Sequence, residues 1–158
     1  MDSNYLFALA IGIGIVAGLR AMTAPAITSW AAHLGWLHLR ATPLAFMGSI
    51  AVVIIFSLAA IGEYINDKLP KTGSRTAAAP FFTRVVMGGL CGACLYVSAN
   101  EPVLTGILMG AIGAVIGTLG GYQARKRLVN GLHVRDIAVA IPEDLIAICL
   151  ALFVVLAH

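Results

Sequence analysis

Hydrophobic residues follow one another along this chain in long runs, without the polar interruptions that an amphipathic helix or strand of a water-soluble domain requires. A run of about 20 apolar residues matches the thickness of a bilayer when it forms a helix. The runs are Tyr5–Leu19, Leu44–Ile61, Phe81–Ser98, Val103–Tyr122 and Ile137–Ala157. This pattern predicts an all-α, polytopic membrane helix bundle of about five spans, forming a single transmembrane domain over residues 1–158.

A shorter and more mixed segment, Ala26–Leu39, separates the first two runs. Its apolar residues recur at helical spacing: Ile27, Trp30, Leu34 and Leu37. About 14 residues are too few to cross a bilayer, so we predict a re-entrant or interfacial half-helix. Trp30 and Trp36 are suited to the level of the lipid headgroups. The alternative is a plain extension of the first helix.

The composition agrees with a membrane protein. The chain is 60% hydrophobic and 11% charged, whereas soluble domains carry about 25% charged residues. The mean hydropathy is +0.96. Most of the surface is therefore expected to contact lipid or other helices. The residues after Met1 lack the positive charge of a cleavable signal peptide, so we expect the first run to remain as an anchor.

Basic residues cluster after the second and the fourth run. Eight of the ten are found there: Lys68, Lys71, Arg75, Arg84, Arg125, Lys126, Arg127 and Arg135. With five crossings, the positive-inside rule predicts that these loops and the N-terminus are cytoplasmic. Arg20 would then lie toward the outer face of the membrane and Arg75 toward the inner face.

One local sequence occurs twice. Arg20 begins the stretch Arg-Ala-Met-Thr-Ala-Pro and Arg75 begins Arg-Thr-Ala-Ala-Ala-Pro. Copies on opposite sides of a membrane are what an inverted repeat would produce. Proline is favoured as the first residue of a helix, so we expect Pro25 and Pro80 each to begin one. The free amides of a helix start, together with an arginine, bind phosphate or carboxylate. The predicted substrate-binding residues are Arg20, Thr23, Pro25, Arg75 and Pro80.

Each of these arginines has a simpler interpretation. Arg75 fits a cytoplasmic residue that obeys the positive-inside rule, and Arg20 fits a side chain that extends to the membrane interface.

Acidic residues accompany the arginines in two places. Glu63, Asn66 and Asp67 share one helical face at the end of the second run, followed by Lys68. Glu143 and Asp144 follow Pro142, which we expect to be the first residue of a helix. Carboxylates inside a membrane either pair with cations or carry protons, so these residues are candidates for proton coupling or ion pairing. No spacing marks a metal site.

Glycines and cysteines are assigned to packing. Glycines four residues apart let helices approach closely, within a subunit or between subunits, and favour a homodimer. These pairs are Gly14/Gly18, Gly88/Gly92, Gly106/Gly110 and Gly113/Gly117. Cys91 and Cys94 form a Cys-x-x-Cys pair inside an apolar run, which favours packing over redox chemistry. We expect no cofactor and no nucleic-acid partner.

Three stretches resemble the bacterial membrane family catalogued as domain of unknown function 4126. They are Gly18-Leu-Arg-Ala-Met-Thr-Ala-Pro25, Glu63-Tyr-Ile-Asn-Asp-Lys-Leu-Pro70 and the pair Glu143-Asp144. The chain departs from the family pattern before Glu143, where His133-Val-Arg-Asp136 replaces an expected Gly-Asn-Pro stretch. The resemblance implies a polytopic protein of the bacterial inner membrane and no particular activity. A fainter similarity to the DedA-type lipid carriers rests on re-entrant segments that combine arginine with proline.

The sequence predicts a small transporter, not an enzyme, for an anionic solute or a lipid phosphate, with coupling to protons. Its partners would be the bilayer, a second copy of the chain and the anion. The first alternative is a membrane scaffold whose arginines and carboxylates form structural ion pairs. The second is a redox enzyme that uses Cys91 and Cys94.

Overall fold

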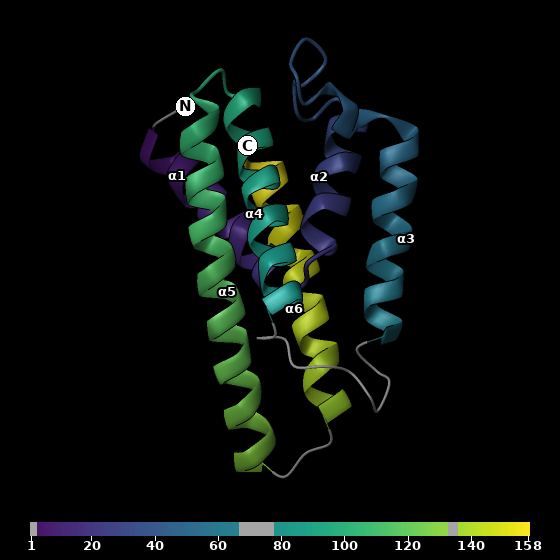
Figure 1. Cartoon of the computed structure of the whole chain (residues 1–158), viewed down its shortest axis with the longest axis vertical. Coiled ribbons are helices and arrows are strands. Elements are labelled where there is room, and N and C mark those ends of the chain that lie inside the picture. Colours follow the sequence, from purple (N-terminus) through teal and green to yellow (C-terminus); the bar gives the residue numbers. More distant parts are fainter. Residues whose placement is uncertain (1–2, 67–77, 133–135) are drawn as a thin grey trace.

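The computed structural model describes residues 3–66, 78–132 and 136–158 of the chain, and the side chains of 4–66, 78–128 and 141–158. All regular structure in these residues is helical, which confirms the predicted all-α class (Figure 1). The elements are α1 (Ser3–Leu19), α2 (Thr23–Leu34), the short 3₁₀ helix η1 (Ala45–Gly48), α3 (Ile50–Asn66), α4 (Ala78–Ser98), α5 (Val103–Leu132) and α6 (Asp136–Ala157).

Two of the described helices are long and apolar enough to cross a membrane. They are α4, with 21 residues and a mean hydropathy of 1.4, and Val103–Leu128 of α5, with 26 residues and a mean hydropathy of 2.0. Two shorter apolar helices of the described part, α1 and α3, have 17 residues each. Length and composition thus support a membrane protein.

Helices α1 and α2 form a hairpin. At the open end, Tyr5 Oη donates to the carbonyl of Ala157, 3.1 Å away, and the amide of His38 donates to Ser98 Oγ, 2.8 Å away. The start of α1 and the chain after α2 therefore lie together with both termini at the top of Figure 1. The chain reverses over residues 20–22. The segment Ala26–Leu39 is not an extension of the first helix, because α2 runs back along the bundle and ends at Leu34.

Glycines bring α1, α5 and α4 into backbone contact. A Cβ atom added to Gly14 would lie 2.2 Å from the carbonyl oxygen of Gly110, and one added to Gly92 would lie 2.2 Å from that of Gly106. No side chain fits in such a space, so glycine is required on these faces. The predicted glycine faces are therefore packing faces within the subunit. Since they are used there, they lend no support to a homodimer.

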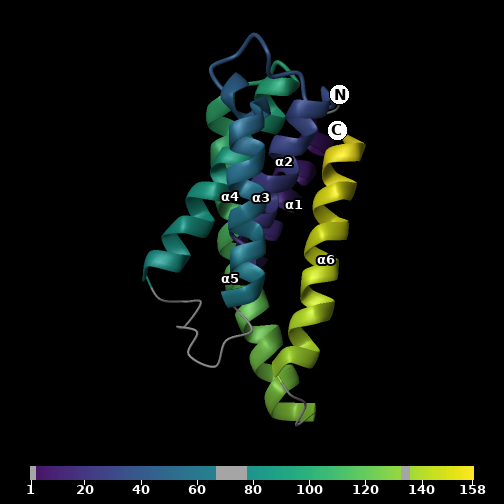
Figure 2. The ribbon, with the colours of Figure 1, turned by 90° about the vertical axis from the view of Figure 1, so that its right-hand side faces the viewer.

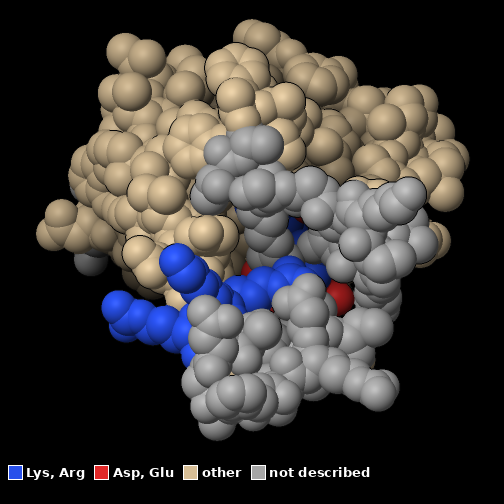
Figure 3. Space-filling model, turned by 60° about the horizontal axis from the view of Figure 1, so that its bottom comes forward, with Lys and Arg blue, Asp and Glu red and all other residues tan. Residues whose placement is uncertain are grey.

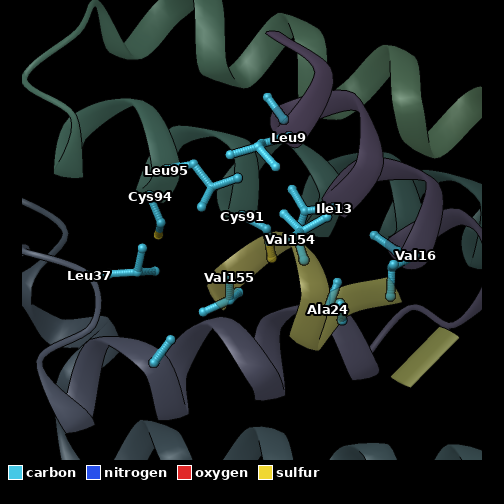
Figure 4. Close-up of a cluster of buried hydrophobic side chains, with 14 of the residues drawn as sticks. Leu9, Ile13, Val16, Ala24, Leu37, Cys91, Cys94, Leu95, Val154 and Val155 are labelled. Atoms are coloured by element: carbon cyan, nitrogen blue, oxygen red, sulfur yellow. The ribbon is translucent and has the colours of Figure 1, made fainter. Parts of the chain in front are cut away.

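An apolar core lies between the helices of the bundle (Figure 4). It is built from α1, α2 and the chain after it, α4 and α6, and its labelled members are Leu9, Ile13, Val16, Ala24, Leu37, Cys91, Cys94, Leu95, Val154 and Val155. Cys91 and Cys94 are buried here as free thiols, as expected of packing residues.

Pro142 does not begin a helix, and that prediction is wrong. It is an interior residue of α6, which begins at Asp136 and is continuous in Figure 2. A proline removes one backbone hydrogen bond but has a helical φ, so a helix can pass through it. Glu143 and Asp144 are therefore not in the first turn of their helix. Pro25 and Pro80, in contrast, are each the third residue of α2 and α4.

Candidate functional site

Arg20 is the centre of a polar cluster at the tip of the α1–α2 hairpin. The residue lies between the two helices and is only 1% exposed. Its guanidinium forms an ion pair with the carboxylate of Asp144 on α6. The guanidinium carbon also lies 5.4 Å from the centre of the Tyr64 ring on α3, which is a cation–π contact. This burial contradicts the alternative in which Arg20 extends to the membrane interface.

The carboxylate of Glu63 occupies the start of α2. Its Oε1 atom accepts the backbone amide of Ala21 and its Oε2 atom accepts that of Met22, each at 2.9 Å. These amides have no partner within the helix, and the helix dipole favours a negative charge beside them. The group that binds these amides is therefore a side chain of the protein. Binding of an anion from outside stays a prediction.

Tyr64 strengthens the same junction between α2 and α3. Its hydroxyl shares a hydrogen bond of 2.7 Å with Thr23 Oγ1, and Thr23 is buried. Tyr64 thus contacts both Arg20 and Thr23, whereas Pro25 contributes the buried first turn of α2. Sequence reasoning did not single out Tyr64. Its position directly after Glu63 was the available signal.

A second ion pair adjoins the first. Arg125 on α5 places Nη1 3.8 Å from Oε2 of Glu143, and both side chains are largely buried. Because Glu143 precedes Asp144 in α6, the Arg20 and Arg125 pairs are neighbours. Sequence reasoning had counted Arg125 among the basic residues of a cytoplasmic loop and had given it no partner. Only the packing of α5 beside α6 identifies its partner.

Arg84 is a further buried arginine that was not proposed as a site residue. It lies in α4, one turn before Gly88, and is 5% exposed. Gly88 contacts Gly110 and Ala114 of α5, and Thr118 of α5 donates to the carbonyl of Gly18 at 3.2 Å. Arg84 is therefore at the depth of the hairpin tip. An arginine within an apolar run was the signal for it.

The remaining predicted site residues are not part of this cluster or cannot be placed. Arg75, Asp67 and Lys68 are outside the described residues. Pro80 is exposed in the first turn of α4, and Asn66 is exposed at the end of α3. In the part of the chain that the structure describes, no group of three or more His, Cys, Asp or Glu residues is placed to hold a metal ion.

The polar cluster is near the basic end of the bundle. Figure 3 views this end, where Lys and Arg side chains gather and acidic atoms are visible beside them. Arg125, Lys126 and Arg127 are in the last turns of α5, at the end opposite to both termini (Figure 1). Arg20 is therefore at the end of the bundle that carries Arg125, and the start of α1 is at the opposite end, because the hairpin returns the chain to the end where it started. Which side of a membrane each end faces stays a prediction.

Comparison with known proteins identifies the family. Residues 7–157 match the Domain of unknown function family DUF4126, so the chain belongs to that family. This confirms the resemblance of the three stretches around Arg20, Glu63 and Glu143. No curated protein and no solved structure matches the chain. The description of the family names no activity, so the function has to be argued from the polar cluster.

Proposed function

We propose that this member of the DUF4126 family is a small integral membrane carrier, which binds an anionic solute or a lipid phosphate at the tip of the α1–α2 hairpin. One observation carries the proposal: two successive backbone amides, which directly follow the buried Arg20 in the chain, hold a carboxylate. Amides at a helix start and a guanidinium are the groups with which proteins bind phosphate and carboxylate. A buried arginine in a membrane protein is costly and marks functional sites.

The proposed membrane arrangement places α3, α4, α5 and α6 across the bilayer. The α1–α2 hairpin enters the membrane and returns to the same side. By the positive-inside rule, the end that carries Arg125, Lys126 and Arg127 faces the cytoplasm, in the inner membrane of a bacterial cell. Both termini would then be outside. This arrangement replaces the predicted five crossings and the cytoplasmic N-terminus.

The carboxylates of the cluster supply a means of coupling to protons. Glu63, Glu143 and Asp144 lie against amides or arginines. An incoming anion would displace a carboxylate from these contacts. A proton that enters with the anion would keep the total charge of the cluster unchanged, so anion and proton would move together.

We also propose that the carrier works as a homodimer, because one subunit of 158 residues is small for a transport pathway. Apolar side chains on the outer face of α3, such as Ile54 and Leu58, are available for such a contact. The inverted repeat remains a prediction, since Arg75 is outside the described residues.

A second function is favoured by the completeness of the same contacts. Arg20 is paired with Asp144, and both oxygens of Glu63 are used by amides. A scaffold needs nothing more than such pairs to connect its helices. It predicts that substitutions in the cluster lower stability and assembly, and that no anion crosses the membrane.

Uptake into proteoliposomes separates the two functions. The probes are radiolabelled inorganic phosphate, acetate and a fluorescent phosphatidylglycerol whose movement between leaflets is followed. We expect Arg20→Ala to reduce transport at least tenfold and Glu143→Gln to weaken its dependence on a proton gradient, whereas Arg127→Ala, at an exposed position, should change little. Circular dichroism and gel filtration verify folding. Equal transport by folded Arg20→Ala and wild type, or no transport by any variant, would contradict the carrier.

A further inference from the structure

We infer that the Glu63 carboxylate competes with an incoming oxyanion for one binding site, which we call the anion seat. The oxyanion must displace this carboxylate and thereby detach α3 from α2. The anion seat is defined here as the amides of Ala21 and Met22 together with the guanidinium of Arg20. The inference rests on the proposed function and deepens it, because it states how the site is regulated.

The geometry of the seat makes the competition exclusive. Each oxygen of Glu63 accepts one amide, and both hydrogen bonds are 2.9 Å long. A backbone amide has a single proton to donate. A carboxylate or phosphate from outside therefore cannot use these two amides while Glu63 does. Its binding needs Glu63 to leave.

The helix that carries Glu63 is attached in a way that permits this movement. Among the described residues, α3 packs against α2 and η1 and against none of the other helices. Three side chains of α3 form hydrogen bonds with the hairpin. Glu63 accepts two backbone amides, Tyr64 shares a hydrogen bond with Thr23, and Ser57 accepts from the indole N–H of Trp30, 3.1 Å away. The α1–α5–α4 contact does not involve α3. It would remain in place while α3 moves.

The charges that face Glu63 determine what must accompany the displacement. Arg20 precedes the two amides in the hairpin turn and is paired with Asp144 of α6. Tyr64 follows Glu63 in α3 and contacts Arg20, and the Arg125–Glu143 pair adjoins Asp144. If Glu63 leaves as the carboxylic acid, with the proton on one of its own oxygens, the seat exchanges one anion for another. One proton is then taken up for each monovalent oxyanion bound, and the total charge of the cluster is unchanged.

The substitution Glu63→Gln tests the competition. Gln keeps the length of the side chain but has one acceptor oxygen and no charge. The purified protein is titrated with inorganic phosphate by calorimetry, and in a second arm with short-chain phosphatidylglycerol, so that free phosphate and lipid headgroup are distinguished. We expect tighter binding by about tenfold or more, the factor that corresponds to removing one competing charge-assisted hydrogen bond. Glu101→Gln is the matched control, because Glu101 is an exposed acid outside the cluster.

Detachment of α3 has its own measurement. In a Trp36→Phe background, the remaining Trp30 reports on its contact with Ser57. When Glu63 is present, we expect the fluorescence emission of Trp30 to shift on binding of phosphate. In the Glu63→Gln variant, we expect the emission to be shifted already without ligand.

The outcomes separate the two proposals. If Glu63→Gln binds phosphate and lipid as the wild type does, while Arg20→Ala loses binding, the competition is wrong and the carrier stands. If no variant binds either probe, both proposals fail. If Glu63→Gln does not fold, Glu63→Asp takes its place. The shorter carboxylate keeps the charge but weakens the contact, and an affinity equal to that of the wild type would overturn the inference.

Discussion

Helices α1 and α3 are both 17-residue apolar helices, but they are held in the molecule in opposite ways. Helix α1 is joined to α5 by backbone contact at Gly14 and Gly18. Helix α3 has apolar side chains on its outer face and buries only Val53 and Ala60. Its hydrogen bonds to the hairpin come from Ser57, Glu63 and Tyr64.

The difference separates a fixed part of the bundle from a part that can be released. Backbone contacts between helices have no side chain to rearrange, so they hold or the fold is lost. Hydrogen bonds of a carboxylate can be exchanged for those of another anion or removed by a proton. The hairpin tip lies between these two parts, which is where a carrier needs its binding groups.

The largest expected effect comes from changing a glycine on each helix. Gly14→Leu places a Cβ atom 2.2 Å from a backbone oxygen of α5, whereas a Cβ atom on Gly62 of α3 meets nothing within 4 Å. We expect Gly14→Leu to destabilise the protein by about 5 kcal/mol or more, a loss that point substitutions reach only when they severely disrupt a core. Gly62→Leu should be within about 0.5 kcal/mol of wild type. Unfolding in mixed micelles measures both, and similar values for the pair would contradict the comparison.

The next effect concerns the ion pair between the hairpin tip and α6. Asp144→Ala leaves the buried Arg20 without its carboxylate and should cost about 3–5 kcal/mol of stability. The double variant Arg20→Met/Asp144→Leu replaces both charges with apolar groups and should recover most of that loss. A carrier would remain inactive in this double variant despite its restored stability. Transport that returns together with stability would show that the pair is not needed for anion binding.

The smallest effect is expected at the α2–α3 junction. Tyr64→Phe keeps the ring over Arg20 and removes only the hydrogen bond to Thr23, which should cost about 1 kcal/mol. Tyr122→Phe on the exposed side of α5 is the control and should cost less. The reactivity of a cysteine introduced at the end of α3 toward a thiol reagent provides a local measurement. This reactivity should increase in Tyr64→Phe and not in Tyr122→Phe. Equal reactivity in both variants would mean that Tyr64 does not hold α3.

The apolar runs were sufficient to predict the helical class, and the four-residue spacing of glycines was sufficient to predict the packing faces. Both are local patterns in the sequence. Hydropathy was also sufficient to select Arg20, Glu63 and Asp144, since charged residues in apolar runs are conspicuous. The direction of the chain after α1 was not predictable in this way. A 17-residue apolar helix has the same pattern whether the chain continues across the membrane or turns back.

The errors at Arg125 and Pro142 have a related cause. Arg125 is paired with Glu143 only because α5 and α6 lie side by side, and no local pattern states that proximity. Pro142 was assigned to a helix start from its ordinary preference. Its actual position depends on where α6 begins, six residues earlier at Asp136.

The hairpin also determines the order in which the tip acquires its partners while the chain is being synthesised. Ala21 and Glu63 are 42 residues apart, whereas Gly18 and Thr118 are 100 apart. At about 5–20 residues per second, Glu63 emerges roughly 2–8 s after the tip, and Thr118 roughly 5–20 s after it. The Glu63 carboxylate is therefore synthesised before the partners of the tip in α5 and α6, and it can bind the amides of Ala21 and Met22 until those helices have been made.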